Sequence, residues 1–173
     1  MIQIRNGCFE TNSSSLHTIC IHKDYINPVN LKELHFRFGE FGQVPERYGS
    51  IEEKASYLWT LICQTASKPR KIREKKSLIR TFISELSPDM TLTFDKFRYD
   101  QDDHCIEIDG FVDKPRGAMD FLEYVLSDKK HLFQYLFGSK SFIMTGNDYE
   151  PADYPIVGSV RKDKDYKIFL KGN

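Results

Sequence analysis

The sequence lacks an excess of charge of either sign, a long apolar run and a close pair of cysteines. Basic and acidic residues number 25 each among 173 residues, which excludes a protein that is basic over its whole surface but leaves room for a local basic patch. No stretch reaches the roughly 20 apolar residues of a membrane helix. The charged opening at residues 1–5 predicts no secretory signal. We therefore expect a cytoplasmic protein without membrane contact.

The scatter of the cysteines argues against a zinc or redox framework. Such sites need ligands that are close in sequence, as in C-x-x-C, and none is present. Each cysteine lies within an apolar strand or helix pattern, which is typical of free, buried thiols in a reducing compartment. The cysteines are Cys8, Cys20, Cys63 and Cys105. From this pattern we expect no metal site and no cofactor.

Apolar patterns in the rest of the chain predict one α+β domain over residues 1–173. Hydrophobic residues make up 40% and aromatic residues 13% of the chain, enough for one core. Alternation predicts strands at 1–9, 16–22, 34–38, 91–99, 104–111, 141–145 and 166–170. Helical spacing predicts helices at 51–66, 70–86 and 117–137. Because the helices cluster, we expect a mainly antiparallel sheet of about five to seven strands with about three or four helices packed on it.

Turn and cap residues divide these elements. The short polar link between the first two strands predicts a hairpin, with two separate strands as the alternative. Ser50 and Glu53 match a capping box at the start of the first helix, and Asp128 matches an N-cap that splits the third helix in two. We expect residues 39–49 to be a loop and residues 159–173 to be an edge strand and tail.

The most site-like polar residues lie between the first two strands, from Glu10 to His17. Serine hydroxyls and loop amides donate hydrogen bonds to anions, and His17 can move a proton near neutral pH. Such a loop suits a phosphate, a ribose or a peptide backbone; the alternative is a polar turn that caps its own backbone. The candidate catalytic residues are His17, Ser13, Ser15 and Glu10, and the candidate ligand-binding residues here are Thr11, Asn12 and Ser14.

A second candidate surface is the basic segment at the helix of residues 70–86. Its cations stand against a single acid, Glu74, and on a helix they would cover a face opposite Ile72 and Ile79. Such a face could lie along phosphates, each contact adding to a salt-dependent affinity; the alternatives are a solvated face or one covered by acids of the same chain. The absence of aromatic residues among these cations argues against stacking of single-stranded bases. The cations are Lys68, Arg70, Lys71, Arg73, Lys75, Lys76 and Arg80.

An acidic stretch at residues 100–113 is the third feature. Its carboxylates could cover the basic helix, or they could bind Mg²⁺, the one cofactor that the composition leaves open. The spacing matches no helix–loop–helix calcium site, and the pair Asp102-Asp103 is typical of an exposed turn. The acids are Asp100, Asp102, Asp103, Glu107, Asp109 and Asp113.

Two stretches resemble a family of small bacteriophage and prophage proteins, mostly of Gram-positive hosts. Residues 5–17 are similar to the family's opening R-x-G-x-F-E-T-N-S-S-S-x-H, and residues 132–148 to its F-L-F segment followed by a T-G-N-D turn. In that family a middle strand often ends I-D-H, whereas here Gly110 follows Asp109. This chain has therefore either lost that histidine or replaced it, with His104 as the candidate replacement. The resemblance implies a mobile-element origin and a functional Glu10–His17 loop, and it implies no shared activity.

These observations lead to one hypothesis of a site and one of a function. The Glu10–His17 loop, Asp109 and the turn of Asn147 and Asp148 would converge at one edge of the sheet. The expected function is that of a phage-type anti-defence protein in the host bacterial cytosol. Most concretely, it is an anti-CRISPR inhibitor that binds guide RNA or the RNA channel of an effector complex, with RNA cleavage by His17 as an extension. The alternatives are a nucleotide-handling enzyme or small-molecule binder at the loop, and a phage structural or assembly accessory with an exposed apolar patch.

Overall fold

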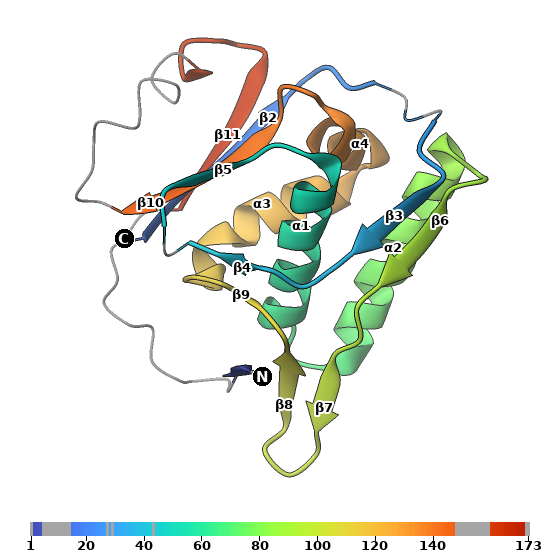
Figure 1. Ribbon diagram of the computed structural model, residues 1–173, viewed down its shortest axis with the longest axis vertical. Helices are drawn as coiled ribbons and strands as arrows, with labels where there is room; N and C mark the ends of the chain where they lie inside the picture. Colours follow the sequence, from blue (N-terminus) through green and yellow to red (C-terminus); the bar gives the residue numbers. More distant parts are fainter. Residues whose placement is uncertain are drawn as a thin grey trace.

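A computed structural model describes residues 2–4, 15–26, 28, 30–42, 44–147 and 160–171, and Figure 1 shows their arrangement. In chain order the elements are β1 (Ile2–Ile4), β2 (Ser15–His22), β3 (Glu33–Phe36), β4 (Glu40–Phe41), β5 (Glu46–Tyr48), α1 (Ile51–Thr65), α2 (Pro69–Leu86), β6 (Thr91–Phe94), β7 (Arg98–Asp100), β8 (Cys105–Ile108), β9 (Phe111–Val112), the 3₁₀ turn η1 (Pro115–Ala118), α3 (Met119–Ser127), α4 (Lys129–Phe137), β10 (Phe142–Asn147) and β11 (Tyr166–Lys171). The α+β class is confirmed. No helix in these ranges is long and apolar enough to cross a membrane.

The strands that the structure describes form four groups, whereas the sequence predicted one sheet. The largest is a four-stranded antiparallel sheet of order β11-β2-β10-β5, and a three-stranded antiparallel sheet has the order β1-β8-β7. The pairs β3–β6 and β4–β9 are parallel. The four groups lie around α1, which is central in Figure 1.

The hairpin predicted for the first two strands is absent from the described residues. β1 pairs with β8, where Ile2 lies opposite Ile108. β2 instead pairs with β10 and β11. An alternating pattern shows which face a strand buries but does not identify its neighbour, so the alternative of two separate strands is the one that holds.

The glycine-rich segment 39–49, predicted as a loop, contains the short strands β4 and β5. β4 pairs with β9 and β5 with β10. Gly39 and Gly110 allow the first pairing, because a Cβ atom on Gly110 would lie 2.6 Å from the Gly39 carbonyl oxygen. These glycines mark a close approach of two backbones, which sequence alone does not distinguish from a loop.

β2 is the central strand of the four-stranded sheet and is buried on both faces. Ile19 and Ile21 belong to the main core, which α1, α3 and α4 share. Cys20 packs on the opposite face with Phe142 and Val160. Burial raises the pKa of the Cys20 thiol to about 12, which keeps it protonated and unreactive. Cys63 and Cys105 are also buried and outside any disulfide, as predicted, and Cys8 lies outside the described residues.

The helices begin and end close to their predicted bounds. At the start of α1, the Ser50 hydroxyl accepts from the Glu53 amide at 3.2 Å and the Glu53 carboxylate accepts from the Ser50 amide at 2.9 Å, which completes the capping box. The predicted joint between α3 and α4 is also confirmed. Asp128 caps α4, because its carboxylate accepts from the Lys130 amide at 2.7 Å.

A buried lysine ties α1 to the turn between α4 and β10. Lys54 is 1% exposed. Its ammonium donates to the carbonyl oxygens of Gly138 at 2.8 Å and Ser141 at 3.3 Å. Burial lowers the pKa of Lys54 to about 8. This lysine fixes the start of β10, the strand that lies beside the candidate site.

Candidate functional site

The two stretches that carried the family resemblance meet at the ends of β2 and β10. Ser15 lies opposite Asn147 and His17 opposite Thr145 in the antiparallel register. Residues 10–14 and Asp148, which complete the predicted site, lie outside the described residues. The register therefore brings the ends of β2 and β10 together, whereas the predicted convergence with Asp109 and Asp148 stays a prediction. The remaining members of the Glu10–His17 loop stay a prediction.

His17 is the candidate whose surroundings are best defined. Its side chain is 0% exposed. Nδ1 of its imidazole lies 3.0 Å from the hydroxyl oxygen of Tyr57, a residue in the middle of α1. Burial raises the pKa of Tyr57, so its hydroxyl stays protonated at physiological pH. This contact fixes the orientation of the imidazole from the side of the helix.

Gly42 and Asp113 lie on the other side of the imidazole. Gly42 has a φ of +124°, and a Cβ atom there would be 2.5 Å from Nε2 of His17 and 2.8 Å from Cβ of Asp113. The pairing of β4 with β9 creates this juxtaposition, since the Asp113 amide donates to the Phe41 carbonyl at 2.9 Å. The His17 imidazole thus lies between the Tyr57 hydroxyl and the backbone of Gly42. Only glycine fits at position 42, because any side chain there would collide with the imidazole.

Thr145 extends this polar cluster across β10. It is 2% exposed, and its hydroxyl donates to the Val44 carbonyl at 2.8 Å. The contact holds the segment between β4 and β5 against the end of β10. The polar cluster therefore consists of His17, Tyr57, Gly42, Asp113 and Thr145.

Asp113, and not Asp109, is the carboxylate-bearing residue that the structure brings beside His17. Asp109 is exposed at the end of β8. His104, the candidate replacement for the family's middle histidine, lies in the exposed turn before β8, where Nδ1 is 3.4 Å from the Tyr99 hydroxyl. Sequence reasoning missed Tyr57 and Asp113 as neighbours of His17. No local pattern links a residue on α1, or one just after β9, to a residue on β2.

The basic segment forms a helix, α2, with its cations outward. Ile72, Ile79 and Ile83 are the buried residues of α2. Glu74 pairs with Arg70 at 3.1 Å and with Lys71 at 3.3 Å. The cations that are exposed are Lys68, Arg70, Lys71, Arg73 and Arg80.

The acidic stretch does not cover this helix. Glu74, on the same helix, pairs with Arg70 and Lys71, and five of the seven cations of the basic segment remain exposed. The pKa of Lys75 is lowered by burial and further by the neighbouring Lys71. Positive charge is therefore concentrated on α2 with little compensation.

The aromatic ring of Phe94, which lies on β6, is beneath two of the α2 cations. The Lys76 ammonium lies 4.6 Å and the Arg80 guanidinium carbon 5.4 Å from the centroid of Phe94, on β6. Cation–π attraction of this kind holds a long side chain in place. The absence of aromatic residues from the basic segment itself gave no sign of this contact.

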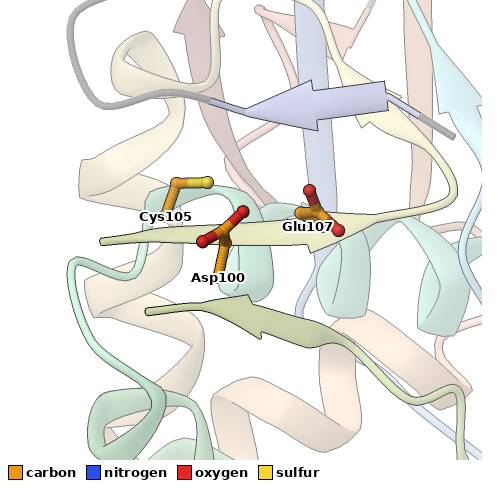
Figure 2. Close-up of side chains that lie close together, drawn as sticks. All are labelled: Asp100, Cys105 and Glu107. Carbon is orange, nitrogen blue, oxygen red and sulfur yellow. The ribbon is translucent and has the colours of Figure 1, made fainter. Parts of the chain in front are cut away.

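Asp100, Cys105 and Glu107 form the one candidate metal group among the described residues, and Figure 2 shows them side by side on the β7–β8 hairpin. Their ligand atoms lie within 4.8 Å of one another. The Asp100 carboxylate already accepts from the amides of Asp102 at 2.8 Å and Asp103 at 3.2 Å, as turn residues do. Mg²⁺ takes oxygen ligands in a regular octahedron, and a set that includes a thiol does not suit it.

The chain matches no known family model, no curated protein and no solved structure. Its function is therefore inferred from the polar cluster around His17 and from the basic face of α2.

Proposed function

We propose that this protein binds RNA through the exposed cations of α2 and acts as a phage-type anti-defence protein, an inhibitor of a guide-RNA effector complex in the host cytosol. The observation that carries the proposal is the concentration of exposed cations on one helix with Glu74 as their acidic partner. The resemblance of residues 5–17 and 132–148 to phage proteins supports the anti-defence part.

Electrostatics favours a polyanionic partner for α2. Burial lowers the pKa of Lys75, and the neighbouring Lys71 lowers it further. An anion beside the helix would offset the repulsion between these two lysines. Each phosphate that a cation neutralises releases condensed counterions, so binding to RNA strengthens as salt is lowered. The protein's net charge of zero makes this attraction local to α2.

The test is retention of RNA on a native gel at two salt concentrations. The probes are a guide RNA alone and the same RNA loaded on its effector nuclease. We expect retention that weakens as salt rises. A double variant, Lys71→Gln with Arg73→Gln, should weaken retention about ten-fold or more.

The matched control removes two exposed lysines from a different element. Lys162→Gln with Lys164→Gln changes the turn before β11 by the same charge and should leave retention close to that of the wild type. Absence of retention at low salt, or equal loss in both double variants, would remove the basis for α2 as the RNA-binding element.

The burial of His17 favours binding without cleavage. An acid–base group must come within hydrogen-bond reach of the phosphodiester, and the His17 side chain is 0% exposed and in contact with Tyr57. On a denaturing gel we expect RNA of unchanged length with both the wild type and His17→Ala. Shortened RNA that depends on His17 would instead make the protein an RNA-directed enzyme.

A second candidate function is the binding or processing of a nucleotide at the ends of β2 and β10. It is favoured by the register that sets Ser15 opposite Asn147 and His17 opposite Thr145. This function predicts that His17→Ala abolishes nucleotide binding in calorimetry while the Lys71→Gln and Arg73→Gln variant binds normally. The RNA-binding proposal predicts instead that RNA binding is weakened by Lys71→Gln with Arg73→Gln and is unaffected by His17→Ala.

A further inference from the structure

The aromatic ring of Phe94, over which Lys76 and Arg80 lie, indicates which form of nucleic acid α2 can bind. Phe36 stacks on one face of the Phe94 ring, with centroids 4.5 Å apart and planes 9° from parallel. The cations over the ring therefore occupy its other face. Trp59, which is 1% exposed, meets the same ring edge-on at 4.9 Å. Both faces of Phe94 are thus occupied before any ligand arrives.

No other aromatic ring described on or under α2 offers an open face to a base. Phe82, the aromatic residue of the helix itself, is half-buried and packs against the main core. The exposed tyrosines of the described residues, Tyr25 and Tyr99, lie on other segments. Proteins that hold single strands rely on base–aromatic stacking, worth about 1–3 kcal/mol per base. Among the described residues, α2 therefore offers no aromatic ring on which the bases of a single strand could stack.

The outer ridge of α2 instead alternates cations with hydroxyls. Arg73, Ser77, Arg80 and Thr81 are all exposed. Arg73, Ser77 and Thr81 are spaced four residues apart, and Arg80 lies three residues after Ser77, so they lie along one side of the helix. From Arg73 to Arg80 the ridge is about 10 Å long, at about 1.5 Å per residue. Phe94 steadies the Arg80 end of the ridge from below. A short, straight and rigid cationic ridge fits a regular backbone better than a flexible one.

We infer that the nucleic acid bound by α2 is double-stranded RNA, recognised through its backbone, with Phe94 as a positioning residue; this rests on the function proposed above. A duplex carries about twice the phosphate charge of one strand over the same length. A-form RNA presents its 2′-hydroxyls in a wide, shallow minor groove, where Ser77 and Thr81 can exchange hydrogen bonds with them. Arg73 and Arg80 contact the flanking phosphates.

The first experiment measures fluorescence anisotropy with three probes of one sequence at two salt concentrations. The probes are an RNA duplex of about 20 base pairs, one of its strands and the corresponding DNA duplex. We expect the RNA duplex to bind about ten-fold more tightly than the single strand, and more tightly than the DNA duplex. Single-stranded RNA that binds as tightly as the duplex overturns the inference and leaves the proposed function standing. No binding of any probe at low salt overturns both.

The second experiment removes the hydroxyls. Ser77→Ala with Thr81→Ala should reduce the preference for RNA over DNA duplex several-fold and leave the salt dependence unchanged. Ser84→Ala is the matched control, because the Ser84 hydroxyl on the same helix already donates to the Thr81 carbonyl at 2.8 Å. An unchanged preference in the double variant contradicts the role of the hydroxyls and with it the assignment to RNA duplex.

The third experiment tests Phe94. Phe94→Leu keeps an apolar side chain but removes the ring, and it should weaken duplex binding several-fold while the slope of affinity against salt stays the same. Phe94→Tyr keeps the ring and should restore wild-type binding. Circular dichroism and urea unfolding confirm that each variant is folded. Equal affinity of the leucine and tyrosine variants, both folded, refutes the positioning role.

Discussion

Replacing Gly42 by alanine tests the packing around His17 most directly. A Cβ atom at this position would lie 2.5 Å from Nε2 of His17 and 2.8 Å from Cβ of Asp113. Both distances are shorter than real contacts of this kind. The φ of +124° is in addition a conformation that residues with side chains rarely adopt. The substitution therefore combines a steric clash with backbone strain.

The expected cost follows from these two contributions. Backbone strain at a position of positive φ costs about 1–3 kcal/mol, and forcing an extra methyl group into a packed interior costs about 1–3 kcal/mol more. The free energy of unfolding should fall by about 2–6 kcal/mol. For a chain of 173 residues that corresponds to a midpoint of thermal unfolding lower by roughly 5–20 °C.

Urea and thermal unfolding of Gly42→Ala and Gly49→Ala make the comparison. Gly49 is the matched control, because a Cβ atom there would meet nothing within 4 Å. Adding His17→Ala to Gly42→Ala should recover about 1–2 kcal/mol relative to the sum of the two single changes, since the clash with the His17 imidazole is then removed while that with Asp113 remains. The reasoning fails if Gly42→Ala and Gly49→Ala unfold within about 0.5 kcal/mol of each other.

Two further predictions concern buried and capping charges. Burial lowers the pKa of Lys54 to about 8 from its ordinary 10.5. Between these two pH values the unfolded chain binds more protons than the folded chain. The contribution of Lys54 to the free energy of unfolding therefore increases as pH rises. The unfolding free energy of the wild type minus that of Lys54→Met should therefore increase by about 2 kcal/mol from pH 8 to pH 9.5 in urea titrations. The buried thiols of Cys20 and Cys63 act with the opposite sign but cancel in the difference, and a flat difference contradicts the prediction. Asp128→Ala should cost about 1 kcal/mol in thermal unfolding, because the Lys130 amide loses its acceptor. Asp128→Asn, which can accept the same bond, should cost much less, and an equal loss in both variants rules out the capping role.

Local signals in the sequence were sufficient for the helices. The capping box at Ser50, the proline that opens α2 and the N-cap at Asp128 act over three or four neighbouring residues, and their geometry is nearly independent of the rest of the chain. The positions of α1, α2 and the joint between α3 and α4 followed from them.

Strand pairing could not be predicted in this way. The alternation in β1 indicates a half-buried strand but carries no information that selects β8 over β2 as its neighbour. The same limit applies to the site. His17 stood out by its chemistry, whereas its contacts with Tyr57 and Gly42 depend on how α1 and β4 pack in three dimensions. Gly42 was the available signal for the close approach to His17, but a glycine in segment 39–49 is equally typical of a loop.

The position of β2 at the centre of the large sheet has a consequence for the order of folding. Its two neighbours are β10 and β11, and the register sets His22 opposite Tyr166, near the other end of the chain. Closing so long a loop is entropically expensive before the contacts form, and folds dominated by such distant pairings form slowly. During synthesis, the apolar residues of β2 would wait unpaired until nearly the whole chain has emerged, while α1 and α2 can form early. A nascent chain that stops before β11 should therefore keep its helices but leave one edge of β2 unpaired, and it would be prone to aggregate.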